Sequence, residues 1–543
     1  MAQWKDKAAQ VFLVLVLAIA IRILSIDQGV GSLQYDEFYH LLAAESWLHD
    51  GSFRIAEGYY PRAGVFTWLV AQSIALAPNN ILVARLPAII AGGLLVASVF
   101  AWTRRFGNCA AWTAALLLCF ENVSVESSQI VRFYSLHALA FWIGSIALYE
   151  SVYGQRSRRI ASACVALAAF ALALHLQIVT LIGIAALGAW LSLDWTVAAP
   201  KHRRPQRAAA VVLLAAAILL IIWLLRDLPA IADVLANYRW SATWAAADRN
   251  NWLFYYRKFA VDYGILLYLL PVAAIVAAGR TPRPALFCLT IFIVTLAVHS
   301  GAGMKDRHYV TYVLPFFFIL WGLAAAPLVA VMRGHARQVA VQLRVPRLAE
   351  AALTWAVIGV ALASSATYFR TVGAVSNVLT GAARDTVIRS SPWVAALPEL
   401  RSLVADASVF VVGDDTRALY FIGGYDLMLN RTMRDDYAPD REFATDPRTG
   451  GATIATAPSM RLVIECYPSG LIVVQRGDWR EPNHVTNDVA DIIETLATRV
   501  PLRSTDFLHV YRWRHDTLPG SIGCATVYRV AGDPGHVPFT VRR

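Results

Sequence analysis

Apolar and polar positions divide this chain of 543 residues into two regions. Up to about Phe369 the sequence is a series of apolar runs separated by short polar breaks, whereas beyond it the pattern is that of an ordinary globular protein. A helix needs about 20 apolar residues to cross a bilayer core. The pattern therefore predicts an α-helical polytopic membrane module at residues 1–369, with a first outer loop at 27–80, and a C-terminal soluble α/β domain at 370–543.

Eleven apolar runs are candidate membrane spans, at residues 9–26, 81–102, 109–122, 133–151, 160–175, 178–195, 208–225, 262–279, 284–299, 310–332 and 350–368. An acidic loop follows the first run in place of a small-residue cleavage site, so we expect a retained span. The shorter run Ala63–Ala77 is predicted to be a juxtamembrane helix that does not cross the bilayer.

Basic residues orient these spans. The net charge is +11, and with the N-terminus inside every inner segment carries at least two Lys or Arg residues. They are Lys5 and Lys7, Arg104 and Arg105, Arg156, Arg158 and Arg159, Lys201, Arg203, Arg204 and Arg207, Arg280 and Arg283, and Arg333, Arg337, Arg344 and Arg347. The positive-inside rule then predicts a cytoplasmic N-terminus and a C-terminal domain on the outer side. This distribution accounts for the charge without a nucleic-acid partner.

The C-terminal region reads as a small α/β domain. Alternation and apolar runs predict strands at Ser408–Gly413, Met460–Cys466, Ser469–Gln475 and Phe507–Arg514, and helices at Arg417–Ile422 and Val485–Arg499. Cys466 and Cys524 either pair, if this domain faces an oxidising compartment, or are two unrelated thiols. We expect the domain to cover a cavity of the membrane module and to help select an acceptor.

Two adjacent acids, Asp36 and Glu37, stand directly before an apolar helical pattern in the first outer loop. Negative charge in the first turn of a helix is favourable by a few tenths to about 1 kcal/mol, which alone would explain the pair. A carboxylate held at the membrane surface can instead act as a general base. The local sequence leaves both interpretations open.

Basic and aromatic residues open two of the predicted spans on the same side. Arg132–Tyr134 precedes one span and Lys305–Tyr309 precedes another. Snorkelling to the interface would explain any single Lys or Arg. Together, Lys305, Arg307 and His308 near the acid pair indicate an anionic ligand, and a lipid phosphate fits both the charge and the location.

In this order and spacing, several segments resemble the GT-C superfamily of membrane glycosyltransferases, which includes protein O-mannosyltransferases and transferases of lipid A or lipopolysaccharide core. The matching segments are Asp36-Glu37, Tyr60-Pro61-Arg62, Arg85-Leu86-Pro87, Arg132–Leu136 and Lys305–Tyr309 with Pro315. The chain departs from the pattern at His308, which interrupts the usual Arg-Tyr. It also lacks, at Tyr59–Gly64, the Lys-Pro-Pro of lipid A aminoarabinose transferases.

The resemblance implies a GT-C fold and an inverting transfer from a polyprenyl-phosphate sugar to a hydroxyl of a glycan, glycolipid or protein. The expected location is the outer, periplasmic face of a bacterial inner membrane. Asp36 would be the base, and Glu37 would orient the acceptor or support Asp36. The leaving phosphate would be bound by Lys305, Arg307 and Arg132, with His308, Tyr309 and Tyr134 as hydrogen-bonding neighbours. Arg62 and Tyr60 are further supporting residues of the site.

Other functions fit parts of the same pattern. Adjacent acids can bind a divalent metal, but a single acid pair favours a site without one. A transporter or flippase of lipid-linked glycans would also present charges to a lipid phosphate, although such proteins usually show internal repeats, which are not found here. A transferase that uses a diphosphate donor is a further alternative within the enzymes.

Overall fold

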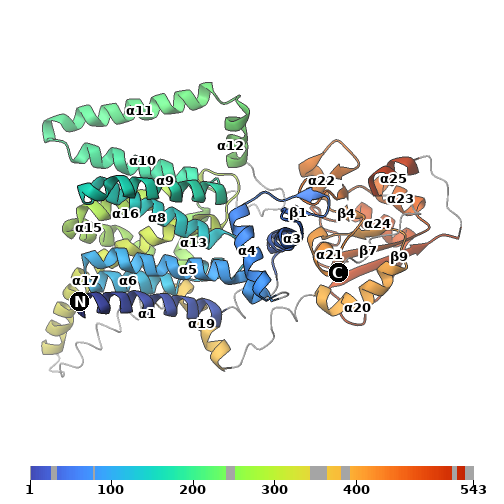
Figure 1. Ribbon diagram of the computed structural model, residues 1–543, viewed down its shortest axis with the longest axis horizontal. Helices are drawn as coiled ribbons and strands as arrows, with labels where there is room; N and C mark the ends of the chain where they lie inside the picture. Colours follow the sequence, from blue (N-terminus) through green and yellow to red (C-terminus); the bar gives the residue numbers. More distant parts are fainter. Residues whose placement is uncertain are drawn as a thin grey trace. The chain divides into compact units, whose positions relative to one another are not determined.

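The structure, a computed structural model, describes residues 2–25, 33–77, 80–239, 251–342, 362, 364–380, 392–516 and 523–531. The chain forms two compact units (Figure 1). The first comprises Met1–Gly29 and Arg85–Ala382, and the second comprises Val30–Ala84 and Ala383–Arg543. The first outer loop therefore folds together with the C-terminal region, and the predicted boundary after residue 369 falls within a helix of the first unit, α19 Ala366–Thr380.

The first unit is helical. Its helices are α1 Ala2–Leu24, α5 Ile81–Thr103, α6 Asn108–Cys119, α7 Asn122–Ser128, α8 Tyr134–Tyr153, α9 Arg159–Leu176, α10 Thr180–Val197, α11 Arg204–Leu224, α12 Pro229–Arg239, α13 Phe254–Tyr263, α14 Ile265–Tyr268, α15 Leu270–Arg280, α16 Pro282–Ser300, α17 Leu314–Gln342 and α19, with the 3-10 helix η5 Arg307–Val313 before α17. The first residues of α5, up to Ala84, belong to the second unit.

The apolar helices make this a multi-pass membrane protein. In the described part of the chain, seven helical segments are long and apolar enough to cross a membrane, or eight if α6 and α7, bent by 60°, form one broken span. The predicted count of eleven stays a prediction. Most of the run at 350–368 lies outside the described residues.

Two predicted spans are broken in the structure. The run at 109–122 ends as α6, because the Glu121 carboxylate accepts hydrogen bonds from the backbone amides of Val123 (3.0 Å) and Ser124 (2.5 Å) and so starts α7. The run at 262–279 is interrupted at Gly264, where φ is +49° and a Cβ would lie 2.5 Å from the carbonyl oxygen of Ser364. Each break brings polar backbone into an apolar stretch.

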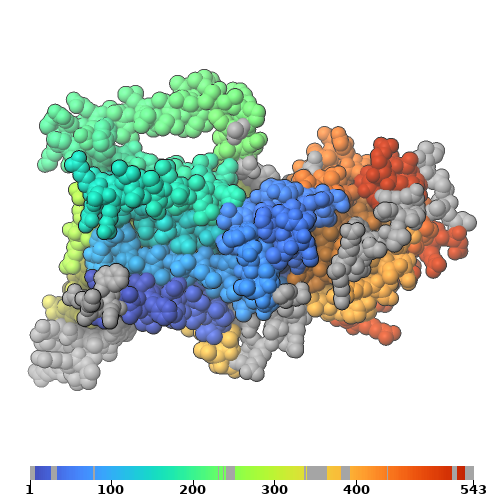
Figure 2. Space-filling model, in the orientation of Figure 1, coloured from blue at the N-terminus to red at the C-terminus, as the bar shows by residue number. Residues whose placement is uncertain are grey.

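Helix α11 exposes large apolar side chains on the surface of the first unit. None of its residues is buried, and Figure 2 shows open space between this green helix and the helices below it. Large apolar side chains such as Ile218, Leu219 and Trp223 are exposed along it. A helix that is apolar on all sides is expected where the surroundings are lipid.

The second unit combines elements from both ends of the chain. The first outer loop supplies α3 Tyr35–Asp50, the hairpin β1 Arg54–Ile55 and β2 Gly58–Tyr59, and α4 Gly64–Leu76. The C-terminal region supplies α20 Pro392–Ala405, β3 Phe410–Val412, α21 Asp415–Phe421, β4 Leu427–Leu429, α22 Arg431–Tyr437, β5 Ala444–Thr445, β6 Ala452–Ile454, α23 Ala457–Cys466, β7 Ser469–Gln475, α24 Asn487–Leu496, β8 Thr498–Arg499, β9 Leu508–Arg514 and α25 Cys524–Ala531. Helix α4, with 13 residues, is too short to cross a bilayer.

A seven-stranded mixed sheet, in the order β5-β6-β4-β3-β7-β9-β8, organises the C-terminal region. Strands β6, β4, β3 and β7 are parallel, and β9 is antiparallel to β7. Apolar residues on both faces of the central strands are buried, for example Val411 and Val412. The predicted α/β class is therefore confirmed, as are the strands at β3, β7 and β9 and the helices at α21 and α24.

The predicted strand at Met460–Cys466 is wrong, because this segment forms the end of α23. Thr456 caps the helix by accepting from the Ser459 amide at 3.3 Å. Met460, Val463 and Ile464 are buried, which is the i, i+3, i+4 spacing of one helix face. Apolar and β-branched residues in this segment favoured a strand at the level of sequence. The Thr456 cap and the burial of one face against α24 and the sheet stabilise a helix instead.

Cys466 and Cys524 form a disulfide between the end of α23 and the start of α25. The alternative of two unrelated thiols is thereby excluded. The bond closes a separation of 58 residues within the second unit. Disulfides persist in oxidising compartments, so the bond is consistent with the predicted outer location of the domain.

Candidate functional site

The two acids of the first outer loop have different surroundings. Glu37 is buried, and its Oε1 accepts a hydrogen bond from the Gln34 amide at 2.9 Å, so it caps the start of α3. Asp36 is exposed. The capping interpretation is therefore correct for Glu37, whereas Asp36 lies on the exposed side of the first turn of α3.

Tyr60 and His40 fix α3 against the rest of the loop. The Tyr60 ring stacks on Tyr39 at a centroid distance of 5.2 Å and meets His40 edge-on at 5.2 Å. Nδ1 of His40 lies 2.9 Å from Oγ1 of Thr67 in α4. Tyr60 is thus a buried packing residue, while Arg62 is exposed just before α4.

In the first unit, the predicted phosphate-binding residues gather around the start of α8 and η5. The Tyr134 ring stacks on His308 at 5.3 Å and lies 6.5 Å from Tyr309. The Arg132 guanidinium donates to the Tyr134 hydroxyl at 3.4 Å and lies over its ring at 5.5 Å. Residues about 170 positions apart in sequence therefore form one cationic and aromatic cluster, whose role in binding a phosphate stays a prediction.

Helix α7 supplies partners that the sequence prediction missed. Glu126 forms an ion pair with Arg307 at 2.6 Å, and the Ser127 hydroxyl lies 3.0 Å from Nδ1 of His308. Lys305 is buried, and its ammonium donates to the carbonyl oxygen of Ala302. Burial lowers the pKa of Lys305. Glu126 lies between the candidate spans at 109–122 and 133–151, and an acid so close to the membrane is the signal that could have identified it, because such groups are costly there.

Buried polar contacts hold α7 at both ends. Oε1 of Glu121 accepts from the hydroxyls of Tyr263 and Thr367, each at 3.0 Å. Arg22 of α1 is fully buried and donates to Ser128 at 2.9 Å and Ser124 at 3.0 Å. These contacts make α7 a fixed platform for Arg307 and His308.

The acid pair and the cationic cluster thus lie in different units. The second unit holds Asp36 and Glu37 on the helix against which Tyr60 packs. The first unit brings together a set of cationic and aromatic residues, Arg132, Tyr134, Arg307, His308 and Tyr309, with Lys305 nearby in sequence. Each half of the predicted site is therefore assembled by long-range packing within its own unit. That the acid pair and the cationic cluster act together as one site stays a prediction.

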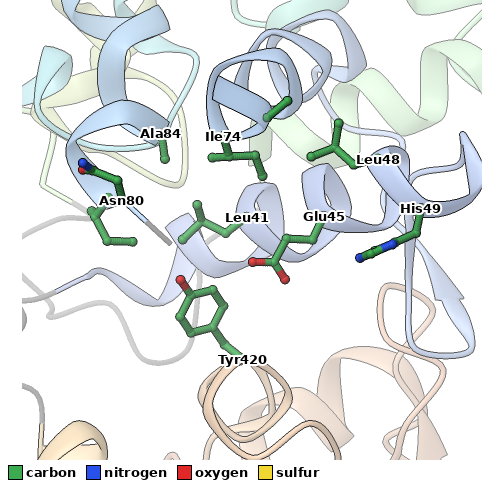
Figure 3. A pocket seen from close by; sticks show the side chains of 10 residues that line it. Leu41, Glu45, Leu48, His49, Ile74, Asn80, Ala84 and Tyr420 are labelled. Carbon is green, nitrogen blue, oxygen red and sulfur yellow. The ribbon is translucent and has the colours of Figure 1, made fainter. Parts of the chain in front are cut away.

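The second unit also contains a cavity of about 270 Å³ between α3, α4 and the start of α5, bordered by Tyr420 of α21 (Figure 3). Its wall is apolar at Leu41 and Ile74, with Glu45 and His49 supplying polar groups. Burial raises the pKa of the Glu45 carboxyl. The lining begins at Leu41, about one helical turn after Glu37, and includes neither acid of the pair.

Metal-binding groups are not apparent in the described ranges, which hold no set of three or more His, Cys, Asp or Glu side chains placed to bind an ion. Three histidines in the described part of the C-terminal region, His484, His509 and His515, have structural contacts. His515 Nε2 lies 3.0 Å from the Ile464 carbonyl oxygen, and His509 stacks on Trp479 at 5.4 Å. The functional groups of the candidate site are carboxylate, guanidinium, ammonium, imidazole and hydroxyl groups.

No protein-family model matches the chain, and no curated protein matches it. Among solved structures, the chain is similar to ArnT from Cupriavidus metallidurans in the apo state, with a TM-score of 0.61 and 16% identity over 93% of this chain and 98% of that chain. It is similar to the same protein bound to undecaprenyl phosphate, with a TM-score of 0.60 and 15% identity over 94% and 99% of the two chains. At this identity the similarity is one of fold, and the predicted GT-C fold is confirmed.

Proposed function

We propose that this protein is a membrane glycosyltransferase that moves a sugar from a polyprenyl-phosphate donor to a hydroxyl acceptor with inversion. The observation that carries the proposal is the cluster of Arg132, Tyr134, Arg307 and His308 at the ends of apolar helices. A phosphate on a lipid tail is the ligand that suits cations at this depth. The fold adds support, since the similar ArnT structure is bound to undecaprenyl phosphate.

The donor side of the reaction needs positive charge. As the bond between the sugar and the phosphate breaks, negative charge develops on the polyprenyl phosphate that leaves. Preorganised cationic donors in a site with little water stabilise such charge more effectively than water does. We assign this role to Arg132, Arg307 and Lys305, with Tyr134, His308 and Tyr309 as hydrogen-bonding neighbours.

The acceptor side needs a base. A hydroxyl is a weak nucleophile near neutral pH, and a carboxylate that takes its proton during attack contributes about 10²–10⁴-fold. Asp36 is exposed on α3, whereas Glu37 is engaged in capping. We therefore assign the base to Asp36 and a supporting role to Glu37. Attack from the face opposite the phosphate inverts the anomeric centre.

The location follows from the same reasoning. The inside position of the basic clusters and the disulfide of the second unit support a bacterial inner membrane with the C-terminal domain in the periplasm. The acceptor would be a glycan, a glycolipid or a protein that presents a hydroxyl there. No metal is assigned a step.

The test is turnover by the purified full chain of a panel of polyprenyl-phosphate sugars, measured as release of polyprenyl phosphate. Asp36→Asn is expected to lower kcat by about 10²–10⁴-fold with little change in the donor KM. Asp50→Asn, an exposed acid at the other end of α3, is the matched control and should retain activity.

Three results would each contradict a part of the proposal. Unchanged release by Asp36→Asn would remove the base assignment. Movement of intact lipid-linked sugar across proteoliposomes, without release of polyprenyl phosphate, would favour a flippase. Release of a diphosphate product would assign a diphosphate donor in place of the monophosphate.

A further inference from the structure

One face of α3 packs against the C-terminal region of the second unit. Tyr35, Phe38 and Tyr39 form this face at the spacing i, i+3, i+4. The Phe38 ring meets Tyr420 at 5.2 Å and Phe421 at 5.9 Å, both in α21. The helix that carries Asp36 is therefore packed against the α/β sheet region by its first turns.

A hydrogen bond fixes the start of this face. The Tyr35 hydroxyl donates to Oδ1 of Asp415 at 2.6 Å and lies 3.0 Å from the Tyr39 hydroxyl. Asp415 is fully buried at the first position of α21, and its Oδ1 also accepts from the Thr416 amide at 2.7 Å. Oδ2 has no hydrogen-bond partner within the part of the chain that is described. Burial raises the pKa of the Asp415 carboxyl to about 7.

A second contact lies one turn further along. The Arg448 guanidinium lies over the Tyr39 ring at 4.6 Å and is held by an ion pair with Asp446 at 2.6 Å. The same loop pairs with the hairpin after α3, since the Glu57 amide donates to the Thr449 carbonyl at 3.1 Å. Both ends of the docking face thus contact side chains that are themselves held by a hydrogen bond or an ion pair.

The docking occurs where a sheet of this kind usually holds a ligand. Strand β3 has parallel neighbours on both sides, β4 and β7, so the chain reverses its direction of winding there. Ligands of open α/β sheets bind at the carboxyl ends of strands at such a point. Here Arg417, which is paired with Asp414 just after β3, donates to the Leu33 carbonyl at 3.1 Å. The start of the first outer loop occupies this place.

We propose that the Tyr35–Asp415 hydrogen bond and the Arg448–Tyr39 contact set the rotation of α3 about its axis, which makes Tyr35 and Asp415 positioning residues for Asp36. The inference rests on the proposed function, in which Asp36 is the base. Asp36 follows Tyr35 by about 100° around the helix, at a side-chain radius of roughly 5–6 Å. A rotation of about 10° moves its carboxylate by roughly 1 Å, and a misplacement of that size can cost about 100-fold in rate.

The experiment compares four variants of the full chain in detergent: Tyr35→Phe, Asp415→Leu, Asp415→Asn and Tyr511→Phe. Tyr511 donates to Glu494 at 3.2 Å elsewhere in the same unit, so Tyr511→Phe is the matched control for loss of a Tyr–carboxylate bond. Asp415→Asn keeps an acceptor oxygen for Tyr35. Two readouts are measured: kcat and donor KM for transfer, and amide hydrogen exchange of residues 35–50.

Tyr35→Phe and Asp415→Leu are expected to lower kcat by about 10–100-fold while the donor KM changes little, because binding of the phosphate does not depend on α3. In both variants the backbone amide hydrogens of residues 35–50 should exchange faster than in the wild type. Asp415→Asn and Tyr511→Phe should resemble the wild type in both readouts. A split between kcat and KM, with rescue by Asp415→Asn, distinguishes positioning from a general loss of structure.

The inference is overturned if Tyr35→Phe and Asp415→Leu both keep wild-type kcat, or if exchange over residues 35–50 is the same in all the proteins. Absence of transfer by the wild type would instead count against the proposed function. Hydrogen exchange would then still decide whether Tyr35 and Asp415 hold α3.

Discussion

The hydroxyl of Tyr35 lies 2.6 Å from the carboxylate of Asp415, although 380 residues separate them in the chain. Tyr35 begins the helix that carries the candidate base, and Asp415 begins the helix after the central strand β3. The first outer loop and the C-terminal region therefore form one structural unit. Any change in its packing is expected to reach Asp36 through α3.

Asp415 leads to a prediction about pH. Burial raises the pKa of its carboxyl from 3.8 to about 7. The groups that face it are Tyr35, Tyr39, Asp414, Asp446, Arg448 and Tyr425. Because the folded state keeps a proton that the unfolded state releases, this group's contribution to the free energy of unfolding falls as pH rises through the interval from 3.8 to about 7.

We expect the thermal midpoint of Asp415→Asn to fall less over that pH interval than the midpoint of the wild type, measured by intrinsic fluorescence. Asp506→Asn, at an exposed ion pair with Arg476, is the control and should follow the wild type. Parallel pH profiles for Asp415→Asn and the wild type would show that the carboxyl does not titrate in this range.

The ion pair between Glu126 and Arg307 predicts an energetic coupling within the first unit. Loss of Arg307 alone leaves a carboxylate that is largely buried, whereas loss of both charges does not. A double-mutant cycle of Glu126→Gln and Arg307→Gln should therefore give a coupling of roughly 1 kcal/mol in thermal stability. The exposed pair Arg54–Glu57 should give a coupling close to zero. Equal couplings for the two pairs would contradict the platform role of α7.

Gly58 is predicted to be intolerant of a side chain. A Cβ at this position would lie 2.4 Å from the backbone carbonyl carbon of Arg448, and backbone cannot move away as a flexible side chain would. Gly58→Ala should therefore lower the stability of the second unit by about 1–3 kcal/mol. Gly477→Ala, where a Cβ meets nothing within 4 Å, is the control. The stability of the second unit in both variants is measured by chemical denaturation, with limited proteolysis as the probe of unfolding.

The Cys466–Cys524 bond should stabilise the second unit. Closing a loop of 58 residues is expected to contribute about 2–4 kcal/mol, so Cys466→Ser should unfold at a lower temperature. The free cysteine Cys109 is exposed, and Cys109→Ser should leave the midpoint unchanged. Thiol labelling of the denatured protein should leave two cysteines unreacted before reduction. Labelling of all six without reduction would contradict the pairing.

The sequence by itself determined the class of the protein and the identity of most candidate groups. Apolar runs about as long as a bilayer is thick reveal membrane helices without any tertiary information. The order of Asp36-Glu37, Arg132–Tyr134 and Lys305–Tyr309 identified residues that the structure gathers within each unit. Strands β3, β7 and β9 were also predictable, because alternation and apolar runs are local properties of the chain.

Only the tertiary structure decided which acid is a cap, which partners surround the cations and what the C-terminal region contacts. The contacts of Glu126 and Ser127 with Arg307 and His308 depend on the 60° bend between α6 and α7. Asp415 contacts Tyr35 because the end of β3 lies next to the first outer loop. The segment Met460–Cys466 likewise became a helix through its cap and its burial. Contacts between residues hundreds of positions apart depend on packing of whole elements, and local periodicity carries no information about that packing.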